Sequence, residues 1–424
     1  MARRRREMLR TRGLGLVLGV LTGIALPAAC GSPEAHQREP LQLHEAGAFD
    51  VIQAEDVATA EAAAGAPDAA PDAEPTDAGL APVELGVTPI VPGAGADMDA
   101  EPDAAATSDQ TLAELSVLAA GARARALVVP LADLLDESLA PNDSAFANLG
   151  QTAALYRARG GSVLFTIALV DHAQDGRPSA LQASWSAAVL RSTLQALIDR
   201  SFDTFGTELA YLSFGTDVDR FLSQANASDR SACTALIEQA LSYAEAHPKR
   251  PPATQIGVTF SAPGLVGAVL PETQTLLRQS DAAVVTNFPL DASFQALSVS
   301  NATAQLQAVA DAVVQAVPGL PLVVQELGYP SATLVGSSLD AQQQFFQAVF
   351  SLLSARRDRF PFVNLYASAD PDEAECEREA VTFGAAGDPF LIAARCSLGL
   401  KDTSGADKPA WAAVLAGLST FQKP

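Results

Sequence analysis

The stretch Leu322-Val323-Val324-Gln325-Glu326-Leu327-Gly328-Tyr329-Pro330-Ser331 decides how the rest of the chain is interpreted. A short apolar run carries a single carboxylate at its C-terminal end, and turn-forming residues follow directly. A parallel strand with both faces covered has this pattern, because the alternation of polar and apolar residues disappears. A buried glutamate is costly, so Glu326 either pairs with an arginine as part of the structure or works in a cleft.

Seven other apolar runs share this character, and segments with helical spacing separate them. The eight runs are Val83–Thr88, Ala126–Pro130, Val163–Val170, Leu209–Phe214, Gln255–Phe260, Ala282–Thr286, Pro321–Glu326 and Phe360–Tyr366. Alternating strands and helices predict a parallel sheet, and eight such units favour an α/β fold of the (β/α)8 TIM-barrel type over residues 81–424. An open doubly wound sheet is the alternative, but no glycine-rich nucleotide loop follows any run.

The first of these runs has a second interpretation. Acidic low-complexity sequence resumes at Ala96–Ala106, so Val83–Thr88 could instead belong to the preceding segment. Without it, however, the barrel has seven strands and does not close. We therefore expect Val83–Thr88 to be the first strand.

Residues 1–30 have the pattern of an export signal. Six arginines precede a short apolar core at Leu14–Leu26, which is too short to be a membrane span. The segment Leu26-Pro27-Ala28-Ala29-Cys30-Gly31 resembles a bacterial lipobox, in which the cysteine carries a lipid. We expect an exported lipoprotein of the cell envelope, anchored to the membrane only through Cys30. Secretion after ordinary signal cleavage is the alternative.

Residues 31–80 predict a disordered linker. They hold eleven acidic residues against the single base Arg38, with Ala and Pro filling much of the rest and Phe49 as the one Phe, Tyr or Trp. Such a composition buries too little apolar surface to offset the loss of chain entropy. Without the six arginines and one glutamate of residues 1–30, the remaining chain has 21 basic and 48 acidic side chains, a formal charge of −27. This charge disfavours nucleic acid as a partner.

Polar side chains follow several of the predicted strands. In a TIM barrel the working face is formed by the C-terminal ends of the strands. Asp171 and His172 follow the third run, Asp217 the fourth, and Asn287 and Phe288 the sixth, while Tyr329 and Tyr366 follow the last two. One histidine on this face makes no metal site, and we expect neither a metal nor a cofactor. Asp219 is expected to cap a loop.

Two of these segments carry a resemblance to a known group of enzymes. Glu208–Asp219, with Thr216-Asp217 at its strand end, resembles the fourth-strand segment of clan A glycoside hydrolases, and Gln325–Ser331 resembles the seventh-strand segment. Endo-galactanases and their bacterial relatives are the best fit. The resemblance implies retaining hydrolysis of a β-linked polysaccharide, with Glu326 as nucleophile and Asp217 as acid/base. It further implies that Thr216, Asp171, His172, Asn287, Phe288, Tyr329 and Tyr366 contact the sugar.

The chain also departs from that pattern. Thr216-Asp217 replaces the Asn-Glu pair of the clan, so an amide is lost and the carboxyl is retracted by one methylene. Tryptophans are few, with only Trp185 and Trp411 present. We therefore expect an exported glycosidase. The alternative is a catalytically inactive carbohydrate-binding lipoprotein with the same barrel, and a third possibility is a structural envelope lipoprotein without a ligand. In each case we expect a monomer.

The cysteines beyond Cys30 suggest one disulfide. Cys376 and Cys396 lie twenty residues apart in one late loop, and an exported protein meets an oxidising compartment. Cys233 is then left single, in a segment with helical character, where a buried thiol is expected.

Overall fold

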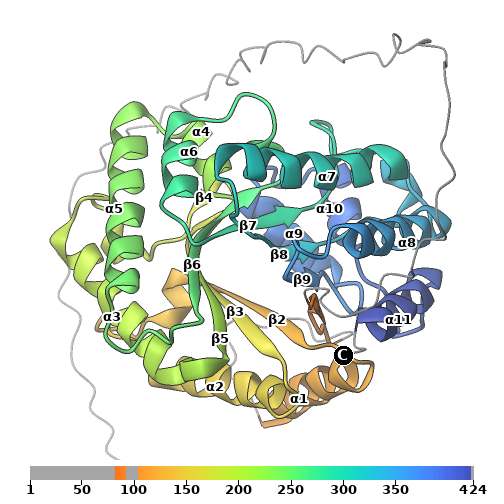
Figure 1. The fold of residues 1–424 in the computed structure, drawn as a ribbon, viewed down its shortest axis with the longest axis horizontal. Helices are drawn as coiled ribbons and strands as arrows, with labels where there is room; N and C mark the ends of the chain where they lie inside the picture. The colour runs from red at the N-terminus through yellow and green to blue at the C-terminus, as the bar shows by residue number, and fades with distance from the viewer. Residues whose placement is uncertain (1–81, 92–103, 422–424) are drawn as a thin grey trace, which may run out of the picture. The chain divides into compact units, whose positions relative to one another are not determined.

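The structure, a computed structural model, describes residues 82–91 and 104–421. The predicted signal segment 1–30, Cys30 and the linker 31–80 lie outside this part of the chain. Eight parallel strands close into a barrel, in the order β1-β2-β3-β5-β6-β7-β8-β9, with helices around them (Figure 1). The strands are β1 (Glu84–Val87), β2 (Ala124–Pro130), β3 (Ser162–Asp171), β5 (Leu209–Thr216), β6 (Gln255–Ser261), β7 (Ala282–Asn287), β8 (Leu322–Leu327) and β9 (Phe362–Leu365). The two-residue β4 (Gln174–Asp175) pairs antiparallel with the end of β3.

The predicted (β/α)8 barrel is thus confirmed, and all eight predicted runs are strands. The first run, Val83–Thr88, contains β1, which pairs with β9 at four positions and with β2 at one, Gly86 opposite Ala124. A Cβ on Gly86 would lie 2.0 Å from the carbonyl oxygen of Ala124, so only glycine allows the two backbones to approach this closely.

Eleven α-helices lie among the described residues. They are α1 (Ala104–Ala119), α2 (Asp143–Arg157), α3 (Ala188–Phe205), α4 (Val218–Gln224), α5 (Ala227–Glu245), α6 (Pro271–Arg278), α7 (Val299–Ala316), α8 (Leu339–Ala355), α9 (Glu373–Thr382), α10 (Pro389–Arg395) and α11 (Pro409–Phe421). Asn142, Asn226 and Ser298 accept backbone N–H bonds at the starts of α2, α5 and α7. None of the described helices is both long and apolar enough to cross a membrane.

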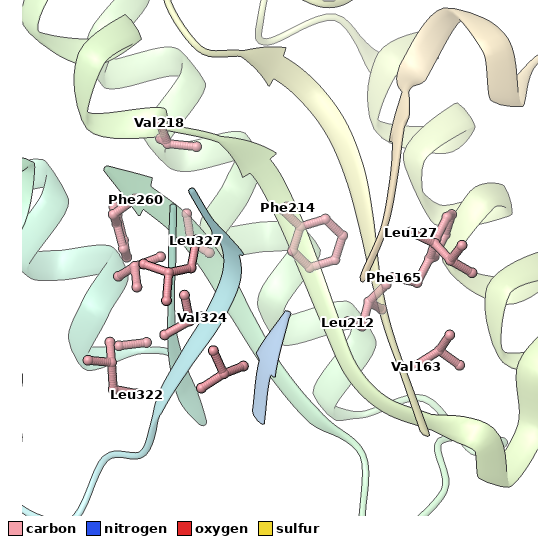
Figure 2. Packing of buried hydrophobic residues seen from close by; sticks show 14 of the residues in the cluster. Leu127, Val163, Phe165, Leu212, Phe214, Val218, Phe260, Leu322, Val324 and Leu327 are labelled. Atoms are coloured by element: carbon pink, nitrogen blue, oxygen red, sulfur yellow. The ribbon is translucent and has the colours of Figure 1, made fainter. Parts of the chain in front are cut away.

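Apolar side chains pack on both sides of the barrel wall. Val163, Phe165 and Ile167 of β3 belong to the large cluster between strands and helices, part of which is shown in Figure 2. Leu164, between them in sequence, belongs instead to a small cluster with Tyr211 and other strand residues. Successive side chains of a strand point to opposite faces, so this small cluster fills the interior of the barrel.

A polar layer also occupies the interior. The Oε1 of Gln325 accepts hydrogen bonds from the hydroxyls of Thr166 at 2.6 Å and Thr259 at 2.9 Å. Thr259 also bonds Ser213, at 2.7 Å. Four strands are joined in this way, because Thr166 lies on β3, Ser213 on β5, Thr259 on β6 and Gln325 on β8.

Between β9 and α11 the chain makes a long excursion that contains α9 and α10. The disulfide between Cys376 of α9 and Cys396, which follows α10, joins the two helices as expected from the sequence. Cys233 is a free thiol, fully buried in α5, also as expected. The base of the excursion is fixed, since Asp370 accepts a hydrogen bond from the backbone N–H of Gly399 and pairs with Lys408 at 2.7 Å.

Candidate active site at the C-terminal ends of the strands

A bulge in β8 directs Glu326 into the barrel mouth. Val324 lies opposite Val285 of β7, but the next pair is Glu326 opposite Thr286, so Gln325 is one extra residue in β8. Residues opposite each other on neighbouring strands share a face, and Thr286 bonds Asp217 inside the mouth. The bulge therefore lets the consecutive residues Gln325 and Glu326 both face inward, which a regular strand cannot do.

Glu326 has no direct partner for its carboxyl among the described residues. Its side chain is partly buried, and no hydrogen bond or ion pair joins its carboxylate to another described residue. Burial raises the pKa of Glu326 to about 7, opposed by the positive charges of Arg395 and His172 and reinforced by Glu379 and Asp217. Much of Glu326 is therefore protonated at neutral pH, whereas a nucleophile works as the carboxylate.

The Asp217 carboxylate is buried and contacts three other side chains. It follows β5 with a left-handed backbone, at φ 50°, and only 1% of it is exposed. Its Oδ2 lies 2.9 Å from Nδ1 of His172 and 3.2 Å from Nε of Arg220, while its Oδ1 accepts a hydrogen bond from Thr286. Burial alone would raise the pKa of Asp217, but these three partners outweigh burial and hold the pKa below its ordinary value.

His172 completes a buried ion pair with Asp217. Its ring stacks on Phe383, with the centroids 3.9 Å apart, and its backbone N–H bonds the carbonyl of Thr216 at 2.9 Å. Burial alone would lower the pKa of His172, but the Asp217 carboxylate raises it above the ordinary value. His172 and Asp217 both adopt positive φ, a strained conformation for residues with a side chain that persists where the surroundings impose it.

Two further aspartates border this pair. Asp171, at the end of β3, keeps a quarter of its side chain exposed and lies 3.8 Å from Nε2 of His172. Asp219 was expected to cap a loop, but it lies in the first turn of α4 and accepts hydrogen bonds from the backbone N–H and hydroxyl of Ser261, each at 2.6 Å. It therefore ties α4 to β6. Burial and the neighbouring Asp217 raise the pKa of Asp219 to about 6.

A buried arginine from α10 occupies the other side of the mouth. Arg395 is 2% exposed, and its Nε donates to Glu379 of α9. Its guanidinium lies over the rings of Phe288 at 4.2 Å and Tyr366 at 4.7 Å. The hydroxyl of Tyr366 donates to the same Glu379. Phe288 and Tyr366 thus lie together beside Arg395, with their ring centroids 5.6 Å apart.

Three residues expected to contact a sugar have other surroundings. Tyr329 stacks on Phe345 of α8 at 4.7 Å and donates its hydroxyl to the carbonyl of Leu297, so it packs in the helix layer. Asn287 lies opposite Leu327, which belongs to the outer apolar cluster, so Asn287 also faces outward. The contacts of Tyr329 place it away from a pocket, whereas both amide atoms of Asn287 are buried without a hydrogen-bond partner among the described residues. The Thr216 hydroxyl is buried and has no hydrogen-bond partner among the described residues.

Sequence reasoning missed five residues of this site, namely Arg220, Thr286, Glu379, Phe383 and Arg395. Arg220 could have been found, because it follows Asp217 by three residues and a helical turn brings such a pair together. Glu379, Phe383 and Arg395 lie within or close to the span bracketed by Cys376 and Cys396. Apart from that cysteine pair, nothing in the sequence indicated that these three residues belong to the site.

Comparison with known proteins supports the fold. No protein-family model matches the sequence, and no curated protein matches it. The structure is similar to "GH5_18 from Streptomyces cattleya in complex with GlcNAc", with a TM-score of 0.62, 17% identity and 82% of each chain covered. It is also similar to GH5_18 from Bifidobacterium longum subsp. longum, with a TM-score of 0.61, 16% identity, and 81% of this chain and 80% of that one covered. An exo-β-1,4-mannosidase from Opitutaceae bacterium strain TAV5 gives a TM-score of 0.57 at 13% identity, covering 80% of this chain and 59% of that one. The described part of the chain therefore shares its TIM-barrel fold with these solved structures.

Proposed function

We propose that the protein binds carbohydrate at the mouth of its barrel and does not hydrolyse it by the two-carboxylate mechanism. This proposal rests on Asp217, whose two carboxylate oxygens are both bound by other side chains. A general acid must hold a proton and present it to the leaving oxygen. Asp217 is 1% exposed, both of its oxygens are engaged, and its pKa is lowered, so it offers neither a proton nor a free oxygen.

The mouth nevertheless keeps groups that suit a sugar. No described residue forms a hydrogen bond or ion pair with the Glu326 carboxyl, and Asp171, next to His172, keeps a quarter of its side chain exposed. Carboxyl groups bond hydroxyls well, and the rings of Phe288 and Tyr366 lie close by. Solved structures with the same fold contain GlcNAc or Manβ1-4GlcNAc, which makes β-linked oligosaccharides the first ligands to test.

Retaining hydrolysis is the second candidate, with Glu326 as nucleophile and Asp217 as acid/base. The observation that favours it is the free carboxyl of Glu326, at the strand end where this fold places its chemistry. It requires Asp217 to leave His172 and Thr286 when substrate binds.

One set of measurements separates the two candidates. Purified protein is tested for binding and for turnover on a panel of β-linked oligosaccharides that includes Manβ1-4GlcNAc. We expect binding without turnover, binding within about twofold for Glu326→Gln, and at least a tenfold loss for Asp171→Trp, which places a bulky ring at the mouth. Glu377→Gln, on the exposed side of α9, is the control and should change neither quantity.

The outcomes are distinct. Turnover that Glu326→Gln abolishes would replace our proposal with the second candidate. Restored turnover in a Thr216→Asn, Asp217→Glu double variant would indicate a barrel that has lost hydrolysis. A protein that binds nothing on the panel would contradict carbohydrate binding and leave the structural lipoprotein standing.

We also propose that the protein is exported and anchored through a lipid on Cys30. The signal pattern of residues 1–30 and the acidic composition of residues 31–80 support this proposal. In cells grown with labelled palmitate, the wild-type protein should incorporate the label and Cys30→Ser should not. A labelled Cys30→Ser variant, or an unlabelled wild-type protein, would rule out the anchor.

A further inference from the structure

Helix α9 contacts the barrel mouth from outside. Phe383, directly after α9, stacks on His172, and the backbone N–H of Ala173 bonds the carbonyl of Thr382 at 3.0 Å. Three residues earlier than Thr382, Glu379 receives the hydroxyl of Tyr366 from the end of β9. Residues 372–388, which we call the α9 cover, therefore contact the ends of β3 and β9.

Two side-chain links join the α9 cover to α10 and the residue after it. Glu379 binds Arg395, and Cys376 forms the disulfide with Cys396, the residue after Arg395. Positions three apart on a helix share a face, so Cys376 and Glu379 of α9 both point toward α10. The disulfide and the ion pair thus act on the same contact between the two helices.

The α10 side of this contact is anchored independently. The Nε2 of Gln342 on α8 donates to the carbonyl oxygens of Ser397, Leu398 and Gly399, at 3.2 to 3.3 Å. Lys408 and Asp370 fix the base of the excursion. Arg395 would therefore stay in place if the disulfide opened, and α9 would then be held only by the noncovalent contacts of Glu379, Thr382 and Phe383.

We propose that the α9 cover is a redox-sensitive lid, locked by the Cys376–Cys396 disulfide, that shields His172 at the barrel mouth. A dithiol reductant would unlock it. The S–S bond accepts two electrons and two protons to give two cysteine thiols, and the dithiol closes to its own cyclic disulfide. Cys396 is partly exposed, so a thiolate can reach its sulfur.

The chain contains its own control for a test of this lid. The side chains of His172 and His247 are both 9% exposed, but His247 stacks on Phe202, at 4.9 Å, far along the chain from the cover. Diethyl pyrocarbonate acylates only neutral imidazole nitrogens, and because Asp217 raises the pKa of His172, the labelling is carried out at alkaline pH. The Nδ1 of His172 is bound to Asp217, which leaves Nε2 as the reactive atom. The ratio of His172 to His247 labelling, measured by peptide mass spectrometry, therefore reports on the lid.

We expect this ratio to rise at least fivefold in a Cys376→Ser, Cys396→Ser double variant and in wild-type protein treated with dithiothreitol. Phe383→Ala, which removes the ring over His172, should raise it without reduction. Arg356→Ala breaks a half-exposed ion pair between α7 and α8 and should leave the ratio unchanged. Hydrogen exchange should accelerate in residues 373–382 and not in α10.

Three results would overturn the lid. They are an unchanged ratio after the disulfide is lost, an equal rise at both histidines, and faster exchange in α10 together with α9. If the double variant does not fold, the reduced wild-type protein decides the question. No carbohydrate enters the assay, so the lid can fail while the proposed function holds, or the reverse.

Discussion

Replacing Glu326 with glutamine should stabilise the protein at high pH and leave it nearly unchanged at low pH. The pKa of Glu326 is raised from its ordinary 4.5 to about 7, so the folded state binds this proton more tightly than the unfolded state does. Below about pH 4.5 the group is protonated in both states, and folding costs nothing extra. As pH rises toward 7, the unfolded state ionises first and the folded state loses stability. Glutamine cannot ionise and avoids that loss.

The size of the effect follows from the pKa. Each tenfold change in proton affinity corresponds to about 1.4 kcal/mol, so the rise at Glu326 sets a ceiling of about 3 kcal/mol. The side chain is partly exposed, and solvent screening lowers the expected gain to about 1–3 kcal/mol at pH 8.5. Urea unfolding followed by far-UV circular dichroism at about pH 4.5, 6 and 8.5 measures it.

The control for this experiment is Glu377→Gln, at an exposed position of α9, which should show no gain that grows with pH. The reasoning about a buried, unpaired carboxyl is refuted if Glu326→Gln is no more stable than wild type at pH 8.5. It is equally refuted if the gain is the same at all three pH values. Either result would mean that water or a neighbouring cation satisfies the Glu326 carboxylate in the folded protein.

Three further substitutions test other parts of the structure. Asp217→Asn should lower the free energy of unfolding in urea by about 2–3 kcal/mol, with a larger loss at about pH 5.5 than at about pH 9. Asp217 raises the pKa of His172, so the ion pair gives stability that is present below about pH 6.5 and is lost as pH rises through the folded-state pKa. Equal losses at the two pH values would contradict the ion pair. Gln325→Leu leaves the hydroxyls of Thr166 and Thr259 without their acceptor and should cost about 2–4 kcal/mol in the same assay, whereas a neutral effect would show that the polar layer is dispensable. Gly264→Ala should lower the free energy of unfolding by about 1–3 kcal/mol, because the added Cβ would lie 1.9 Å from Oδ2 of Asp219. An unchanged unfolding midpoint would show that Asp219 can move away without loss of stability.

The barrel could be predicted from the sequence because its signal is local. Each strand is a short apolar run with covered faces, as in Leu322–Glu326, and eight such runs with helices between them leave few other folds. Even Val83–Thr88, despite the acidic sequence that follows it, was placed correctly by the need to close the ring.

The geometry of the site could not be predicted in the same way. The bulge that turns Glu326 inward depends on the register between β7 and β8. The residue types at Gln325–Leu327 do not indicate that register. The direction of Asn287 could not be predicted for the same reason, because one position along a strand reverses the face. Arg395 reaches the mouth only through the fold of the excursion after β9, so its local sequence carried no sign of its role.

The short first strand has a mechanical consequence. Any tension on the chain before Pro82 enters the barrel through β1, whose pairing with β9 runs parallel over the four residues Glu84–Val87. A force along that strand acts on all the backbone hydrogen bonds between β1 and β9 at the same time, instead of breaking them one after another. Resistance to such a pull is governed by the rate of unfolding and not by equilibrium stability. The seam at Gly86 and Ala124 would then be the place where the ring first opens under load.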